Sequence, residues 1–349
     1  MGDRDLVSAD DVRLMQGLAQ RVTAVRPDLL NSDATFGELA WIWGKGHAAL
    51  GASWRRRLWF ADGELVAWGW AYLPHRVRRS DGSVKDVTRA YLGYQVHPDH
   101  APLLDEVIDW YDGVAANLKR TVLPSMADEF ALRRWRAHGY VTDPASLGDT
   151  GSWTQMNERS LVDLEQPVLP AGYRFRTADE AGPEAAVQAH VDAWAPSTYS
   201  AEGYEGVRRT ATYRGDLHVL VEAPEGIMAA SAIMWLDEAN HTAEFEPVGT
   251  HPGYRRRGLG TALLLHGMGL ARGRRRAHDR RMPGRAGVSE RPRAVLRRRI
   301  PAVLPRRTAD QAPARGSDGD SVRNRLVIAK ALCRKEALGG AAGSRRVRA

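Results

Sequence analysis

Apolar residues along the chain follow two spacings, one typical of helices and the other typical of strands. Apolar positions three and four residues apart indicate helices, and short runs rich in β-branched and aromatic residues indicate strands. In the first half of the chain these patterns predict a helix, a hairpin, a strand and two further helices, in that order. Their ranges are 8–25, 57–60 with 66–72, 91–96, 103–117 and 130–138.

The second half of the chain repeats much of this order. It predicts a strand, a helix, a hairpin, a strand and a helix at 172–177, 184–194, 217–222 with 227–236, 242–248 and 258–270. Two α/β units of similar order indicate an internal duplication. We therefore expect an α/β (α+β) fold of two tandem units, each with a mixed, mostly antiparallel sheet flanked by helices. Pro167 and Pro170 interrupt regular structure at the join, which gives domains of 1–160 and 161–272.

The composition is that of a globular protein, with 43% hydrophobic residues and no apolar run of the length of a membrane span. The first residues are charged and lack the apolar stretch of a secretory signal. The single cysteine, Cys333, has no partner for an internal disulfide, and no cysteines and histidines have the spacing of a zinc site. We therefore expect a cytoplasmic protein that contacts no membrane and binds no metal.

The net charge of +8 would suggest nucleic-acid binding if it were spread over the whole chain. Residues 271–349, however, hold 23 Lys and Arg against 6 Asp and Glu, a net charge of +17. Residues 1–270 hold 27 against 36, a net charge of −9. The part of the chain with regular patterns is therefore acidic, and the arginine runs lack interleaved aromatic residues. These features argue against nucleic acid as the main partner and leave binding through the tail as an alternative.

One turn carries the clearest chemical signal in the sequence. After the strand at 242–248, the segment 251–261 brings three arginines and two glycines to the start of an apolar helix. Glycines let the backbone approach a ligand closely, and the N–H groups at the start of a helix attract anions. The amides of 256–261 would hold a diphosphate, whose charge the arginines would neutralise. A basic turn that only caps a helix is the alternative interpretation.

At these residues the sequence resembles a known family. The motif Arg255-x-x-Gly258-x-Gly260, preceded by a strand and followed by Thr261-Ala-Leu-Leu, is similar to the acetyl-CoA signature of the GNAT (GCN5-related N-acetyltransferase) superfamily. The resemblance implies an acetyl-CoA-dependent N-acetyltransferase, in which the strand before the loop splays from its neighbour and pairs with the pantetheine arm. The implied cofactor-binding residues are Val248, Gly249, Thr250, Arg255, Arg256, Arg257, Gly258, Leu259, Gly260 and Thr261.

The family's general base is often a glutamate on this same strand, and Glu244 has the spacing to Gly258 that the family uses. Glu246, two residues on, shares its face of the strand and is the second candidate. The resemblance implies direct transfer, with the thioester and an acceptor amine held in one ternary complex. Glu244, acting through water, would remove the ammonium proton. A solvated strand face is the alternative for both glutamates.

The first unit resembles a degenerate copy of the second. Its segment 96–105 keeps the outline of strand, proline and helix, but Pro102 and Leu103 stand where glycines would allow close backbone approach. The stretch 131–140 is similar to a late helix of the family. We therefore interpret the first unit as a scaffold and as a wall of the acceptor site, in a tandem arrangement like that of the mycothiol synthase-like acetyltransferases.

After Gly273 the family pattern fails, because arginine runs replace the expected strand, helix and final strands. One interpretation is a disordered basic arm over 273–349. The other is a frameshift, because the Ala and Gly codons of a GC-rich gene read as Arg when out of phase. Moved by one nucleotide, the codons of 274–309 permit a peptide that contains L-Y-Y-G-V-G-F, which the family places here. We favour the frameshift, which would leave the second unit truncated, its sheet edge exposed and its activity impaired.

Three functions stay open on the sequence alone. They are an N-acetyltransferase acting on a small-molecule or peptide amine, a non-catalytic acyl-CoA-binding module, and a nucleic-acid-binding protein that uses the basic tail. Trp194, Tyr199 and Tyr204 fall where the family shapes its acceptor pocket, although aromatic residues there also serve plain packing. His251 and His266 are interpreted as a loop residue and a helix-face residue rather than as catalysts. The acceptor amine and the oligomeric state are not specified.

Overall fold

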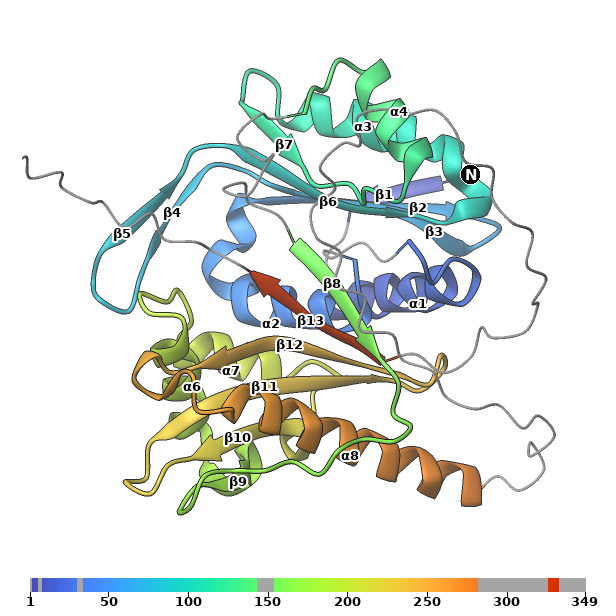
Figure 1. The fold of residues 1–349 in the computed structure, drawn as a ribbon. Helices are drawn as coiled ribbons and strands as arrows, with labels where there is room; N and C mark the ends of the chain where they lie inside the picture. Colours follow the sequence, from blue (N-terminus) through green and yellow to red (C-terminus); the bar gives the residue numbers. More distant parts are fainter. Residues whose placement is uncertain (1, 6–7, 30–33, 143–153, 282–325, 333–349) are drawn as a thin grey trace, which may run out of the picture.

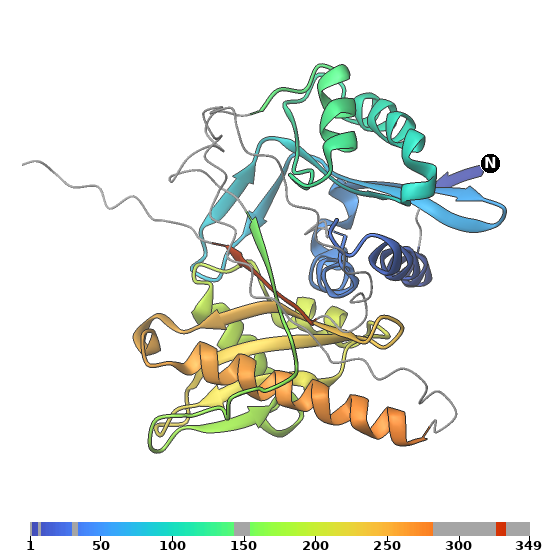
Figure 2. The same ribbon diagram turned by 45° about the vertical axis from the view of Figure 1, so that its right-hand side comes forward.

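The computed structural model of the chain describes residues 2–5, 8–29, 34–142, 154–281 and 326–332. Within them two β-sheets face each other across a layer formed by helices α1 (Ala9–Val25) and α2 (Phe36–Leu50), as Figure 1 and Figure 2 show. Two further helices, α3 (Leu104–Val114) and α4 (Glu129–Ala137), cover the outer face of the first sheet. Among the described residues, none of the helices is both long and apolar enough to cross a lipid bilayer.

The first sheet contains β1 (Gly2–Asp5), β2 (Trp54–Ala61), β3 (Glu64–Tyr72), β6 (Ala90–Val96) and β7 (Arg120–Val122), in this order. Its strands are antiparallel except for β6 and β7, which are parallel. Asp62 and Gly63 connect β2 to β3 with positive φ angles, the turn chemistry that an Asp-Gly pair predicts. A separate hairpin of β4 (His75–Arg78) and β5 (Val84–Val87) extends from β3.

The second sheet contains β8 (Thr154–Arg159), β13 (Leu326–Leu332), β12 (Thr242–Thr250), β11 (Met228–Asp237), β10 (His218–Glu222) and β9 (Arg174–Thr177), in this order. Only β12 and β13 are parallel. The helices of this unit are α5 (Ala178–Ala181), α6 (Pro183–Ala193), α7 (Ala201–Arg208) and α8 (Leu259–Arg281). Apolar residues of α8 and of one sheet face form a common core, in which Phe245 and Leu263 are fully buried.

The two units share one order of elements. With the β4–β5 hairpin, α4, the short helix α5 and the 3-10 turns set aside, the first unit has the order β1-α1-α2-β2-β3-β6-α3-β7. The second unit has the order β9-α6-α7-β10-β11-β12-α8-β13. In each unit the strand after the last of these helices lies parallel to the strand before it. The prediction of two tandem α/β units with mostly antiparallel sheets is therefore confirmed. The exact boundary between 160 and 161 stays a prediction, since β8, which precedes it, lies in the second sheet.

The short elements β1, β4, β5, β7, β8, α5 and α7 were not predicted, and three larger differences also occur. Helix α2 was not predicted, because its apolar residues include many Trp, Ala and Gly at no clear period. Helix α8 continues through Arg281, beyond the predicted end of the domain at 272. Strand β12 is not the open edge expected of a truncated sheet, since β13 lies beside it and pairs in turn with β8. Cys333 and most of the predicted basic tail, 282–325 and 333–349, lie outside the described residues.

Tryptophan side chains dominate the layer between the first sheet and α2. Trp54 and Trp70 meet edge to face with ring centroids 4.9 Å apart, and Trp43 of α2 lies 6.1 Å from Trp70. The Arg56 guanidinium lies 5.0 Å from the Trp43 ring and also faces the other two rings. Burial lowers the pKa of Arg56, but a guanidinium keeps its charge at neutral pH. These rings fix α2 against the first sheet.

The same helix packs against the second unit. A Cβ added to Gly206 of α7 would lie 2.0 Å from the carbonyl oxygen of Gly44, so the backbones of α2 and α7 are in direct contact. Trp41 of α2 is fully buried, with ring centroids 5.3 Å from His190 and 5.0 Å from Tyr199. Helix α2 therefore belongs to the cores of both units and holds them in one arrangement.

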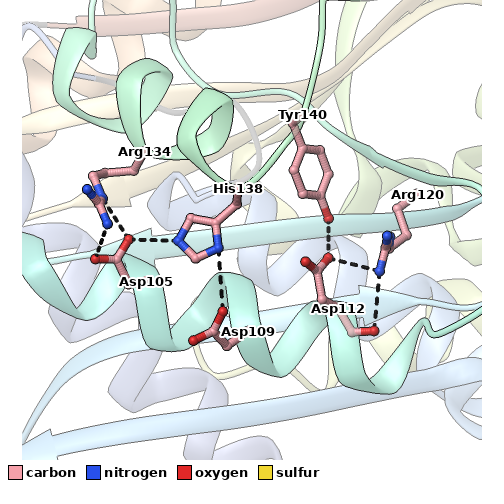
Figure 3. Close-up of polar contacts among 7 residues, drawn as sticks. All are labelled: Asp105, Asp109, Asp112, Arg120, Arg134, His138 and Tyr140. Carbon is pink, nitrogen blue, oxygen red and sulfur yellow. Dashed lines mark hydrogen bonds and ion pairs between the residues drawn. The ribbon is translucent and has the colours of Figure 1, made fainter.

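Polar contacts join α3 to the stretch around α4 on the outer side of the first unit (Figure 3). The Asp105 carboxylate accepts two hydrogen bonds from Arg134, each of 2.7 Å, and lies 3.1 Å from Nε2 of His138. These partners hold the pKa of Asp105 below its usual range. Tyr140 donates to Asp112 at 2.6 Å. The stretch that resembles a late family helix is thus tied to α3, on the face of the sheet opposite α2.

Candidate functional site

Strand β12 carries most of the predicted site residues, and a bulge interrupts it. At Glu246 and Pro247 two residues of β12 oppose one residue of β11. The indole N–H of Trp235 donates to the carbonyl oxygen of Glu246 at 2.7 Å, and Glu246 itself is half-buried. The bulge separates a first segment with Glu244 from a second segment, 248–250, that leads into the loop.

Beyond the bulge, the backbone groups of β12 alternate between β11 and the opposite edge. The N–H of His251 donates to β11 at 2.9 Å. The N–H and C=O of one strand residue point to the same side, and successive residues alternate. The backbone groups of Gly249 therefore point to β11 as well, whereas those of Val248 and Thr250 point to the opposite edge. Of the three residues predicted to pair with a pantetheine arm, two have their backbone groups at the edge where such an arm would lie.

Gly249 is placed for a different contact. A Cβ added there would lie 2.6 Å from the Cβ of Ala193 and 2.9 Å from Nε1 of Trp194. A glycine at this position lets the end of α6 lie directly on the strand. The close packing brings Trp194, one of the aromatic residues predicted near the acceptor, next to the second segment of β12.

The turn after β12 has an unusual backbone. A short 3-10 turn, Pro252–Tyr254, follows the strand, and α8 begins at Leu259. Arg256 and Gly258 have φ angles of 66° and 79°, a conformation that costs a non-glycine residue on the order of 1 kcal/mol. A Cβ added to Gly258 would meet no atom within 4 Å. The backbone conformation thus favours glycine at 258, and the space beside it is open.

The start of α8 is an anion-binding environment. The N–H groups of Leu259, Gly260 and Thr261 belong to the first turn, where no acceptor exists within the helix. The N–H of Ala262 is the one that bonds back, to the carbonyl oxygen of Gly258 at 3.0 Å. The first turn contains no acidic residue, so nothing in it offsets the positive end of the helix dipole. The chemistry of this helix start fits a phosphate or diphosphate.

The three arginines of the loop are exposed but differ in their contacts. Arg255 donates to two backbone carbonyl oxygens, at 3.2 and 3.4 Å. Arg257 donates to the Tyr173 hydroxyl at 2.8 Å and lies over the Tyr254 ring, 5.1 Å from its centroid. Both side chains therefore brace the loop. Arg256, between them, is carried by the residue with positive φ.

Glu244 lies before the bulge with its carboxylate buried. The residue is 8% exposed, and its two oxygens accept hydrogen bonds from the Thr35 hydroxyl at 2.5 Å and from the Gly37 N–H at 2.7 Å. Burial raises the pKa of Glu244 to about 7, against the lowering effect of these two donors and of the Glu38 backbone N–H. A solvated strand face, the alternative interpretation of this residue, is therefore wrong for Glu244.

A small cavity borders this carboxylate. Its volume is about 20 Å³, and its lining residues are Thr23, Thr35, Phe36, Trp235, Asp237, Thr242 and Glu244. A polar cavity above roughly 10–15 Å³ can hold one water molecule if two or more polar groups contact it. Three threonines and two acidic residues of the lining can supply such groups. The structure therefore has room for a single water molecule beside Glu244.

Most of the second unit is similar in sequence to a known protein family. Residues 185–282 match the sequence model of the Acetyltransferase (GNAT) family. The chain carries a GNAT domain. The matched segment runs from α6 to the end of α8, so it contains both Glu244 and the loop with Gly258. This match supports N-acetyltransferase chemistry with acyl-CoA in general terms.

Several solved structures are similar to the chain at low identity. A GCN5-related N-acetyltransferase from Sphaerobacter thermophilus is 19% identical, with a TM-score of 0.45 over 78% of this chain and 83% of that one. A tandem GNAT protein from the clavulanic acid biosynthesis pathway is 16% identical, with a TM-score of 0.45 over 81% and 86%. The Escherichia coli ribosomal-protein-S18-alanine N-acetyltransferase is 24% identical, with a TM-score of 0.25 over 29% and 61%. No curated protein sequence matches the chain. With TM-scores below 0.5, the fold assignment rests on the element order and the family match.

The inner face of the GNAT domain contains a buried chain of hydrogen bonds. The hydroxyls of Tyr204 and Tyr213 are 2.9 Å apart, Tyr213 lies 3.2 Å from Nδ1 of His218, and Nε2 of His218 lies 3.0 Å from Ser231. Burial lowers the pKa of His218 to about 3, so its imidazole is neutral at neutral pH. Tyr204, predicted near the acceptor, is thus part of a satisfied core network.

Sequence reasoning missed Thr35 and Gly37, which hold Glu244 from the first unit. Their only local signal is a threonine in front of a helix that was itself not predicted. The interpretation of the histidines agrees with the structure, since His251 accepts from a loop N–H at 3.0 Å and His266 stacks on Phe175 at 4.0 Å. Within the described ranges, no group of three or more His, Cys, Asp and Glu side chains is arranged to hold a metal ion.

Proposed function

We propose that the GNAT domain of this chain is an acetyl-CoA-dependent N-acetyltransferase that transfers an acetyl group directly to an amine of a small molecule or peptide. The observation that carries the proposal is one strand and its following turn, which combine a buried glutamate with an anion-binding helix start. When bound, acetyl-CoA supplies the acetyl group in activated form, as a thioester.

The loop and strand residues divide the binding of this cofactor among them. The N–H groups of Leu259, Gly260 and Thr261 hold the diphosphate, and Arg256 neutralises its charge. Arg255 and Arg257 keep the loop in shape through their contacts with the backbone and Tyr173. The outward backbone groups of Val248 and Thr250 bind the pantetheine arm, while Gly249 acts through its packing against α6. The residues present therefore fit the cofactor that the family uses.

Glu244 is the general base. An acceptor amine is protonated at neutral pH, and it becomes a nucleophile only when that proton is removed. A carboxylate with a pKa near 7 is ionised in about half of the molecules at neutral pH, which is close to the best compromise for proton transfer. The water that the neighbouring cavity can hold would relay the proton to Glu244. Glu246, half-buried at the bulge, is the second candidate.

The decisive test of cofactor binding is Gly260→Ala. A Cβ at this position would contact only the Thr250 hydroxyl, at 3.6 Å, and its φ is not positive, so the chain without ligand tolerates alanine. A diphosphate that approaches the amide closely does not. We expect calorimetry with acetyl-CoA to show at least about a tenfold weaker Kd for this variant, which corresponds to about 1.4 kcal/mol. Unfolding experiments should show equal or greater stability.

Gly113→Ala is the matched control, because Gly113 also lies in a helix and an added Cβ there meets no atom within 4 Å. This variant should bind acetyl-CoA like the unaltered chain. Unchanged affinity in Gly260→Ala would contradict the placement of the diphosphate at the start of α8. An absence of acetyl-CoA binding in the unaltered chain would contradict the function itself.

Turnover separates the enzyme from the alternatives. A screen of amines, aminoglycosides and cysteine conjugates should find an acceptor whose acetylation is lost in Glu244→Gln. Binding of acetyl-CoA without turnover of any amine would favour a non-catalytic acyl-CoA-binding module. Salt-sensitive DNA binding that disappears when residues 273–349 are deleted would favour nucleic-acid binding through the tail. We place the enzyme in the cytoplasm, in line with its single cysteine.

The tail bears on how active this chain is. We propose that residues after Gly273 are read out of frame, and that the chain is consequently less active than one with the restored frame. Sequencing this gene, or a related gene, across the Gly273 codon tests the first part, and an unbroken native frame would contradict it. Comparing acetyl transfer by the two chains tests the second, and equal rates would refute it.

A further inference from the structure

The two groups that hold the Glu244 carboxylate come from the other unit. Thr35 is the N-cap residue of α2, and Gly37 lies in the first turn of that helix. Thr35 is 6% exposed, so water does not compete freely for its hydroxyl. The carboxylate on β12 thus sits at the positive end of a helix that begins about two hundred residues earlier in the chain.

The hydroxyl of Thr35 suits both charge states of Glu244. When the carboxylate is ionised, the hydroxyl and the Gly37 N–H both donate to it, as the two distances show. When the carboxyl is protonated, its O–H can donate to the same hydroxyl oxygen, because a hydroxyl is both donor and acceptor. The Gly37 N–H keeps its acceptor in either case. Glu244 therefore keeps a hydrogen-bond partner in both of its protonation states.

The close packing around Gly37 leaves the Glu244 carboxylate no room for a different position. A Cβ added to Gly37 would lie 2.4 Å from the Trp235 ring and 2.8 Å from Oε2 of Glu244. The start of α2 is therefore pressed against β11 and β12, and the carboxylate has one place in which both donors reach it. That place borders the cavity, which Thr35 lines together with Glu244.

We propose that Thr35 is a positioning residue for Glu244, so that the first unit completes the proton-transfer site of the GNAT domain. This inference rests on the proposed role of Glu244 as general base. It gives the first unit, which lacks the glycines of the cofactor loop, a specific part in the reaction. The part is to fix the base and to keep a hydrogen-bond partner for it in both protonation states.

The charges around Glu244 determine the direction of the expected effect. The charge of Glu38 on α2 raises the pKa of Glu244, and Asp237 on β11 lines the same cavity. The Thr35 hydroxyl and the backbone N–H groups of Gly37 and Glu38 lower this pKa. Removing the hydroxyl leaves burial and the neighbouring charge less opposed. The pKa of Glu244 should then rise.

The test is Thr35→Val, which keeps the shape of the side chain and removes the hydroxyl. The full chain is labelled with glutamate enriched in ¹³C at the carboxyl carbon and titrated by NMR, with Glu244→Gln used to assign the signal. In Thr35→Val the pKa of Glu244 should rise by about one unit, as expected for losing one hydrogen bond to a charged group. In Thr35→Ser, which restores the hydroxyl, it should stay within a few tenths of a unit of its original value.

Kinetics give a second readout. The acid limb of the pH profile of kcat/KM should move to higher pH by the same amount in Thr35→Val and return in Thr35→Ser. Thr121→Val is the control, because the Thr121 hydroxyl also donates, at 3.0 Å to a backbone carbonyl, but on β7 of the first unit. It should move neither the titration nor the profile. If Thr35→Val does not fold, Thr35→Ala removes the same hydroxyl with a smaller side chain.

An unchanged Glu244 titration in a folded Thr35→Val or Thr35→Ala chain would overturn the proposal, as would equal shifts in the serine and valine variants. The NMR titration needs no substrate. If the chain acetylates no amine but the titration shifts as described, the contact between the units stands and the proposed function fails. If turnover is present and the titration does not move, the enzyme stands and the role of Thr35 fails.

Discussion

Replacing Glu244 by Gln should abolish the pH dependence that this buried group imposes on stability. The pKa is about 7 in the folded chain and about 4.5 in the unfolded chain. Between these values the folded state holds the proton more tightly, so the free energy of unfolding falls as the pH rises. The contribution of the group is fully present below about 4.5 and is lost as the pH rises through 7. The difference of about 2.5 units corresponds to about 3 kcal/mol.

The glutamine side chain fits the same partners. Its carbonyl oxygen can accept from the Gly37 N–H, and its NH₂ group can donate to the Thr35 hydroxyl oxygen. Near pH 4 the two proteins should therefore unfold with similar free energies. Near pH 8 Glu244→Gln should be more stable by up to about 3 kcal/mol, because the unaltered chain must then bury a charge.

Urea unfolding at half-unit steps from pH 4 to pH 8.5, followed by tryptophan fluorescence, measures this difference directly. Glu129→Gln is the control, since Glu129 is exposed on α4 and pairs with Arg133 at 3.7 Å. Its stability relative to the unaltered chain should not depend on pH in this range. A constant difference between Glu244→Gln and the unaltered chain across the whole range would refute the reasoning, because it would mean that Glu244 titrates alike in both states.

Further variants probe the packing of the fold. Gly206→Ala places a Cβ 2.0 Å from the Gly44 carbonyl oxygen, so α2 and α7 must separate. We expect the free energy of unfolding in urea to fall by about 2 kcal/mol, within the range of overpacked cores. An unchanged free energy would mean that the helices do not touch. Asp105→Asn should cost about 1 kcal/mol at pH 7, because Arg134 and His138 lose a charged partner. The pKa of Asp105 is lower in the folded chain than its unfolded value of 3.8. The stabilisation by the ionised carboxylate is therefore present above pH 3.8 and is lost as the pH falls through the folded pKa, so the cost of Asp105→Asn should vanish in acid. An equal cost at pH 7 and pH 3 would contradict the ionic origin.

Local patterns in the sequence were sufficient for most of the elements. Helix and strand periods are properties of short segments, so α1, the β2–β3 hairpin and the β10–β11 hairpin were predicted close to their observed bounds. The repeated order of elements similarly revealed two units. The loop from Arg255 to Thr261 was readable for the same reason, because a glycine with positive φ and the first turn of a helix are determined by neighbouring residues.

The environment of Glu244 was decided only by tertiary structure. Its spacing to the loop identified it as a candidate, but whether it lay on a solvated face or in a buried site depends on what packs against β12. That partner is α2, whose Thr35 and Gly37 are more than two hundred residues away along the chain. Likewise, pairing with β11 determines the bulge at Glu246 and Pro247. It also determines that the backbone groups of Gly249 point to β11. Contacts between distant segments depend on the packing of whole units, which no local period encodes.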